Sequence, residues 1–117
     1  MASEFRQLVF ENEELHEALV EHFGRPDERV PREGIRAAAI AADEMSVELI
    51  GKSDTAQQRP SHVPAEDVAA ALIGLCRKQG IPLPRGSKKY LVCSGDNLAL
   101  RIVMKRERII EIIEEAS

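Results

Sequence analysis

The feature that most constrains this chain is a repetition of its own pattern at an interval of 53 residues. Ala18-Leu19 aligns with Ala71-Leu72, and Pro31-Arg32 aligns with Pro84-Arg85. Apolar positions recur at the same interval, first at helical spacing and then in alternation. A pattern that occurs only twice at this length does not suit a solenoid. It predicts an internally duplicated domain with pseudo-two-fold organisation.

Each copy is expected to contain a helix and two strands, either with a lead strand before the helix or without one. We place the first copy at about residues 5–52, a linker at 53–62 and the second copy at about 63–104, within one domain covering 1–117. These units would form one mostly antiparallel sheet with the helices on one face, which is an α+β fold. A C-terminal helix is expected over 105–116, although its isoleucine-rich sequence would also suit a strand.

The two helices are indicated by apolar residues at helical spacing. Asn12 is a candidate N-cap for the first helix, and Glu13 and Glu14 suit the positive end of the helix dipole. Pro64 begins the second helix, which ends near Gly80. The expected apolar faces comprise Leu15, Ala18, Leu19, His22 and Phe23 in the first helix and Val68, Ala71, Leu72, Leu75 and Cys76 in the second.

The second copy ends in a predicted β-hairpin. Residues 88–94 and 98–104 flank the turn residues 95–97, whose sequence is Gly-Asp-Asn. The corresponding residues 35–42 of the first copy are rich in alanine, and intrinsic propensity alone favours a helix there. We expect a strand instead, because the same register of the second copy is a hairpin and the alternating run 45–49 follows.

The overall composition is that of a globular protein. Apolar residues make up 44% of the 117 residues and charged residues 31%, which are ordinary values for a folded domain. No apolar run approaches the roughly 18 residues needed to cross a membrane. Two cysteines do not make a disulfide framework. We therefore expect a cytoplasmic location and no membrane partner.

The charges are unevenly distributed along the chain. Residues 1–67 carry a formal charge of −8, whereas residues 77–108 carry +7. Such a split is consistent with an interaction surface or with self-association, and also with an unevenly charged solvated surface. The net charge of −4 is unlike that of a nucleic-acid-binding domain. Nucleic acid is therefore not the expected partner, although the basic 77–108 surface with Tyr90 leaves it as a further alternative.

No metal, cofactor or catalytic site is predicted. The sequence contains no Cys-x-x-Cys or His-x-x-x-His pair, which are typical spacings of metal ligands. His16 lies on the expected solvent side of the first helix, His22 on the rim of its apolar face, and His62 in the linker. Cys76 and Cys93 are expected to be buried, because apolar residues occupy the positions 53 residues earlier. Nothing assembles a nucleophile, a base and an oxyanion site, so the sequence favours a binding protein over an enzyme.

Two arginines are the first candidate site. Arg32 and Arg85 each follow a proline where a helix gives way to a strand, and duplication would make them a pseudo-symmetric pair. Forked guanidiniums bind carboxylate or phosphate groups, and Lys88 and Lys89 would add positive charge. The alternative function is therefore an anion or nucleotide sensor. The same arginines could simply cap the preceding helices.

An acidic face of the first helix is the second candidate site. Glu13, Glu17 and Glu21 would contact a basic protein partner, or they would form an ordinary solvated face. The uncovered face of the predicted sheet would need the C-terminal helix or a second subunit, which favours a homodimer. The sequence thus predicts a small non-enzymatic interaction or regulatory module that is homodimeric and binds a protein partner.

Overall fold

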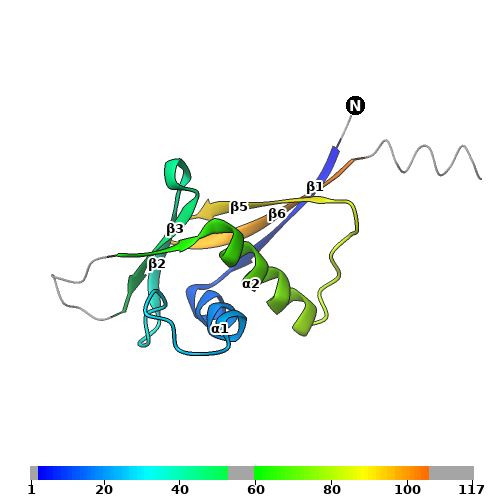
Figure 1. The fold of residues 1–117 in the computed structure, drawn as a ribbon. Coiled ribbons are helices and arrows are strands. Elements are labelled where there is room, and N and C mark those ends of the chain that lie inside the picture. The colour runs from blue at the N-terminus through cyan, green and yellow to red at the C-terminus, as the bar shows by residue number, and fades with distance from the viewer. Residues whose placement is uncertain (1–2, 53–59, 106–117) are drawn as a thin grey trace, which may run out of the picture.

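The computed structural model describes residues 3–52 and 60–105 of the chain (Figure 1). The fold is α+β, with two helices and six antiparallel strands among these residues. In chain order the elements are β1 (Ser3–Phe10), α1 (Asn12–Phe23), β2 (Ile35–Ala41), the short 3-10 helix η1 (Ala42–Glu44), β3 (Ser46–Gly51), β4 (Ser61–Pro64), α2 (Ala65–Lys78), β5 (Lys88–Ser94) and β6 (Asn97–Lys105).

The strands form two sheets, so the prediction of one sheet is wrong. One sheet has the order β1-β6-β5 and the other β2-β3-β4. The lead strand of each half pairs with the last strand of the other half, β1 with β6 and β4 with β3. Each lead strand therefore completes a three-stranded sheet instead of joining the two hairpins. The sheets are linked where the Ala38 N–H donates to the Asp96 carbonyl at 3.1 Å.

The same order of elements occurs in both halves of the described chain. Strand, helix, strand and strand follow one another from β1 to β3, and again from β4 to β6. Helix α2 begins 53 residues after α1, and β5 has the bounds of β2 shifted by the same interval. Residues 35–41 are a strand, as predicted. Local helix propensity is overridden there because Ala38 packs into the core and is 3% exposed.

The start of α1 differs from the sequence-based prediction. Glu11, not Asn12, is the N-cap, and Glu14 Oε1 accepts a hydrogen bond from the Glu11 N–H at 3.0 Å. The Asn12 side chain has a different role. Its Nδ2 donates to the carbonyls of Arg36 at 2.9 Å and Asp96 at 3.0 Å. Asn12 therefore ties the first turn of α1 to both sheets at the point where they meet.

The two helices pack against each other and against the strands, and Figure 1 shows both on the same side of the sheets. All five residues predicted for the apolar face of α2 are buried. In α1, Leu15, Ala18 and Leu19 are buried and Phe23 is half-buried. His22 is exposed instead, and its Nε2 lies 3.3 Å from Asp67 Oδ1 of α2. The core lies between the helices and the inner faces of the strands.

Two element boundaries in the structure differ from those predicted from the sequence. Strand β4 includes His62, which the sequence analysis assigned to the linker. Strand β6 extends to Lys105, so the predicted C-terminal helix cannot begin there. The remainder of that predicted helix, residues 106–116, lies outside the described residues.

Candidate functional site

A cavity of about 560 Å³ separates α1 from the segment that follows it. We call this segment, residues 24–34, the α1 loop, and the cavity the α1 cleft. Gly24 ends the helix with φ of +66°, and its N–H donates to the Val20 carbonyl at 3.1 Å. Glycine adopts this left-handed conformation without a steric penalty. The chain can therefore turn sharply away from α1 and leave space beside it.

The floor of the α1 cleft is apolar. Leu19 is fully buried beneath it, whereas Val20 stands at its side with 49% of its surface exposed. Half-buried Phe23 and buried Val30 close the two ends, and prolines of the loop complete the lining. A hollow that presents aliphatic and aromatic carbon to solvent can take up an apolar side chain.

An ion pair within the loop sets its shape. Asp27 Oδ1 accepts hydrogen bonds from the N–H and the Nε–H of Arg29, both at 2.9 Å, and Oδ2 accepts one from Nη2 at 2.8 Å. These hydrogen bonds from Arg29 lower the pKa of the Asp27 carboxyl from 3.8 to about 2. The Arg29 guanidinium also lies 5.0 Å from the centre of the Phe23 ring. Asp27, Arg29 and Phe23 therefore form one stacked unit between the loop and the end of α1.

Two further contacts hold the loop at its sides. His16 Nε2 lies 2.8 Å from the Pro31 carbonyl, so this nitrogen carries the proton and donates it. The Ser61 hydroxyl donates to the Arg29 carbonyl at 2.7 Å. The prediction that His16 is a solvent-side residue is therefore wrong. It is half-buried and anchors the loop to the helix.

The rim of the α1 cleft carries charges of both signs. Each of its acids has a base beside it, Glu21 paired with Lys78 of α2 and Asp27 paired with Arg29. Arg25 and Arg32 also lie on the rim, and both are exposed. Within the described part of the chain, neither guanidinium makes a hydrogen bond or an ion pair. The rim therefore offers two guanidiniums to an anionic group.

The structure does not bring the two predicted arginines together. Arg32 belongs to the α1 loop and Arg85 to the segment after α2, residues 79–87, which we call the α2 loop. Figure 1 shows the two loops on opposite sides of the helix pair, so one small anion does not reach both within a chain. Lys88 and Lys89 lie beside Arg85, at the start of β5, and the Lys89 ammonium donates to the Ser87 hydroxyl at 3.2 Å.

The predicted acidic face of α1 is partly neutralised by neighbouring bases. Glu17 Oε1 lies 3.5 Å from the Lys78 ammonium, which also contacts Glu21, and Glu13 lies 3.9 Å from the Lys52 ammonium. The hydrogen bonds and the proximity of Glu21 raise the pKa of Lys78. These glutamates connect α1 to its neighbours, and they present less free negative charge than the sequence suggested.

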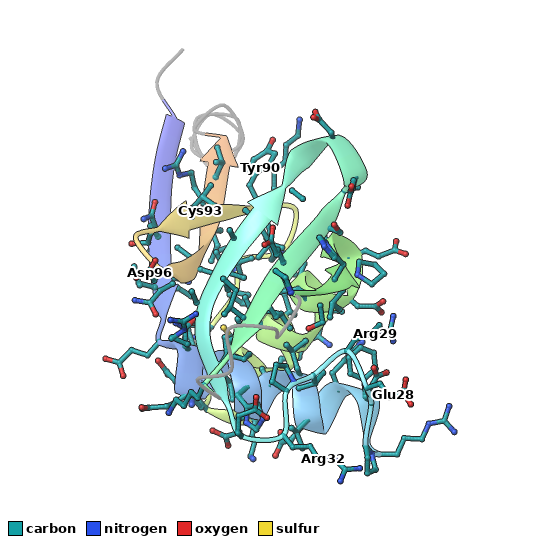
Figure 2. The ribbon with its side chains drawn as sticks, turned by 90° about the vertical axis from the view of Figure 1, so that its left-hand side faces the viewer. Glu28, Arg29, Arg32, Tyr90, Cys93 and Asp96 are labelled. Carbon is teal, nitrogen blue, oxygen red and sulfur yellow. The ribbon has the colours of Figure 1, made fainter. Side chains whose placement is uncertain are left out.

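The two cysteines occupy different environments. Cys76 is buried in the core, as predicted, and burial raises the pKa of its thiol. Cys93 is exposed, so the prediction that it is buried is wrong. It lies near the turn end of β5, which is an edge strand of its sheet and pairs only with β6. Figure 2 shows Cys93 and Tyr90 far from Arg29 and Arg32 of the α1 loop.

A serine, a histidine and a carboxylate also meet on the β3–β4 side. Ser46 Oγ lies 3.5 Å from His62 Nδ1, and Glu44 Oε2 lies 3.7 Å from that same nitrogen. In a nucleophilic triad the serine and the acid contact opposite nitrogens of the imidazole ring. Because both groups here approach Nδ1, the histidine cannot pass a proton from the serine while the acid orients it. This cluster does not have the geometry of a hydrolase site.

Sequence analysis missed Val20 and Arg25 as site residues. Val20 directly follows Leu19 of the apolar face. A single apolar residue beside such a face is only weak evidence for a binding site, because isolated exposed apolar residues are common. No group of three or more metal-ligating side chains occurs in residues 3–52 and 60–105. Over the same residues, neither helix has the length and hydropathy required to span a bilayer.

The α1 cleft is thus an apolar hollow with two exposed arginines on its rim. Comparison with known proteins adds nothing to this description, because no family model, curated protein or solved structure matches the chain.

Proposed function

We propose that this protein is a non-enzymatic interaction module that binds a segment of a protein partner in the α1 cleft. The observation that carries this proposal is the combination of an apolar hollow of about 560 Å³ with two rim guanidiniums that have no partner in the described chain. Val20, with 49% of its surface exposed, would be covered by such a segment. Burial of apolar carbon is favourable by roughly 25 cal/mol per Å².

The chemistry of the cleft defines the class of segment that fits it. The floor suits one or two aliphatic side chains. Arg25 and Arg32 suit a carboxylate that closely follows these aliphatic side chains in the ligand. A guanidinium can donate two parallel hydrogen bonds to such a carboxylate. The rim acids Glu21 and Asp27 are already paired with bases, so they do not cancel this preference. The expected ligand is therefore a short apolar segment followed by acidic residues.

A labelled hexapeptide tests this proposal directly. Fluorescence anisotropy is measured with a probe that carries two leucines followed by two aspartates, flanked by glycines. Two control peptides replace the aspartates by lysines or the leucines by serines. We expect each control peptide to bind at least about tenfold more weakly, since each loses either the charge pairing or the apolar burial. Equal binding of all three peptides would contradict the proposal.

The chain supplies a matched control for the arginines. Arg32→Gln should weaken binding of the leucine–aspartate peptide about threefold to tenfold, as expected for an exposed charge-assisted contact. Arg85→Gln removes an equally exposed arginine that also follows a proline, and it should leave binding unchanged. An equal loss in both variants would contradict a binding site confined to the α1 cleft.

We also propose that the chain arose by duplication of a strand–helix–strand–strand unit. The repeated order of elements and the constant interval of 53 residues support this origin. If the two halves are still equivalent, a fragment covering residues 60–105 should pair with a second copy of itself in place of the first half. Circular dichroism and sedimentation of this fragment test the proposal. An unfolded monomer under native conditions would count against it.

A further inference from the structure

We propose that the α1 cleft receives the C-terminal segment, residues 106–117, of a second copy of this chain. The proposal rests on the function proposed above for the cleft, and it names one occupant. That occupant makes the protein a homodimer. The proposal follows from the chemistry of the cleft, the sequence of the segment, and the place where the described chain ends.

The sequence of the segment matches what the cleft requires. After Arg108 the chain reads Ile-Ile-Glu-Ile-Ile-Glu-Glu-Ala-Ser, which contains four isoleucines, three glutamates and no base. Its isoleucines suit the apolar lining, which includes Leu19, Val20 and Phe23. Its last two glutamates adjoin an isoleucine pair, so their carboxylates could contact the rim guanidiniums while the isoleucines fill the hollow.

The path of the described chain indicates that the segment comes from another copy. Strand β6 ends at Lys105, which pairs with Ser3 at the outer end of its sheet. Figure 1 shows this end of the sheet on the opposite side of the molecule from the α1 loop. The described chain therefore ends away from its own cleft, and we assign the segment to the cleft of a neighbouring copy.

Reciprocal exchange of the C-terminal segments would limit the assembly to two chains. If each chain places its C-terminal segment in the cleft of the other, the two contacts are identical and related by a two-fold axis. Once the first contact has formed, the second occurs within one complex and at a high effective concentration. Two individually weak contacts at an exposed rim can then hold a dimer together.

Charge reversal of the full-length chain tests the proposal. Light scattering coupled to size exclusion, at about 50 µM protein, should give twice the chain mass for the wild type. Arg25→Glu with Arg32→Glu should give the mass of a single chain, and so should Ile112→Ser with Ile113→Ser. Adding Glu114→Arg and Glu115→Arg to the reversed arginines should restore the dimer, because the two charges have exchanged places. Melting curves check that all variants remain folded.

The outcomes separate this proposal from the function on which it rests. A monomeric wild type, or a dimer that survives both sets of substitutions, overturns the exchange of C-terminal segments. In either case, binding of the leucine–aspartate hexapeptide to the cleft would still support the interaction module. A full-length protein that binds neither this hexapeptide nor a synthetic 106–117 peptide, and is monomeric, would overturn both proposals. A dimer that dissociates on adding the 106–117 peptide supports both.

Discussion

The α1 loop and the α2 loop follow helices at corresponding places in the two halves, yet different contacts hold them. In the α2 loop, Ile81 and Leu83 pack against the core, and the Ile81 N–H donates to the Cys76 carbonyl at 2.8 Å. Arg6 of β1 fixes the same loop by donating to the Pro82 carbonyl at 2.6 Å. The α1 loop is held by the Asp27–Arg29 pair and by hydrogen bonds from His16 and Ser61, and a cavity remains between it and α1.

The residue at the end of each helix accounts for this difference. Cys76 is small and fully buried, so the α2 loop can close over it. Phe23 occupies the position 53 residues earlier, and its bulky ring carries the Arg29 guanidinium at 5.0 Å. The stacked pair holds the α1 loop off the helix. The α1 loop thus packs on an aromatic side chain where the α2 loop closes over a small one.

The largest expected difference between the two halves concerns a pair of buried leucines. Leu19 and Leu72 lie 53 residues apart and both are fully buried, and Leu19 also lines the α1 cleft. Leu72→Ala should lower the free energy of unfolding by about 3–5 kcal/mol, and Leu19→Ala by about 2–3 kcal/mol, because the site beside the cleft can relax or admit water. Urea denaturation measures both values. Equal losses would mean that the cleft does not loosen the packing around Leu19.

A smaller difference in stability between the two halves is expected at the residues that follow these leucines, Val20 in α1 and Ile73 in α2. Ile73 is half-buried against the core, whereas Val20 is 49% exposed. Ile73→Ala should cost about 1–2 kcal/mol of stability, and Val20→Ala less than about 0.5 kcal/mol. Peptide binding should show the reverse order, with a severalfold loss for Val20→Ala only. A loss of affinity confined to Ile73→Ala would place the binding surface on the wrong half.

The sequence predicted much of this fold because its signals were periodic. Every residue expected on the apolar face of α2 is buried, since the 3.6-residue spacing identifies that face without knowledge of its partners. The β5–β6 hairpin was predictable from its turn, in which Gly95 adopts φ of +61°. Repetition then identified residues 35–41 as a strand against their helix propensity.

The remaining features depend on contacts between distant residues. Alternation tells which face of a strand is buried, but it does not tell which strand lies beside it, so the pairing of β1 with β6 was missed. The exposure of Cys93 follows from the edge position of β5, which is also a matter of strand order. The α1 cleft depends on how Asp27 and Arg29 fold the loop, and no periodic pattern encodes that contact.

The smallest expected effect is on pH dependence. The folded pKa of Asp27, about 2, lies below its ordinary value of 3.8. The stability gained from the ionised carboxylate is therefore complete above about pH 4 and is lost as the pH falls toward 2. In acid unfolding followed by circular dichroism, Asp27→Asn should weaken the pH dependence in this window. If Asp27→Asn and the wild type unfold with the same pH dependence in acid, the Asp27–Arg29 pair does not stabilise the α1 loop.

We expect the α1 cleft to bind ligand and the corresponding region beside α2 not to. The most direct measurement is a ¹H–¹⁵N correlation spectrum recorded during titration with the leucine–aspartate hexapeptide. Gly24 and Gly34 report on the α1 loop, and Gly80 and Gly86 report on the α2 loop. The account predicts saturable shifts at Gly24 and Gly34 with none at the other two. Shifts centred on Gly80 and Gly86, or no shifts at any of the four amides, would contradict it.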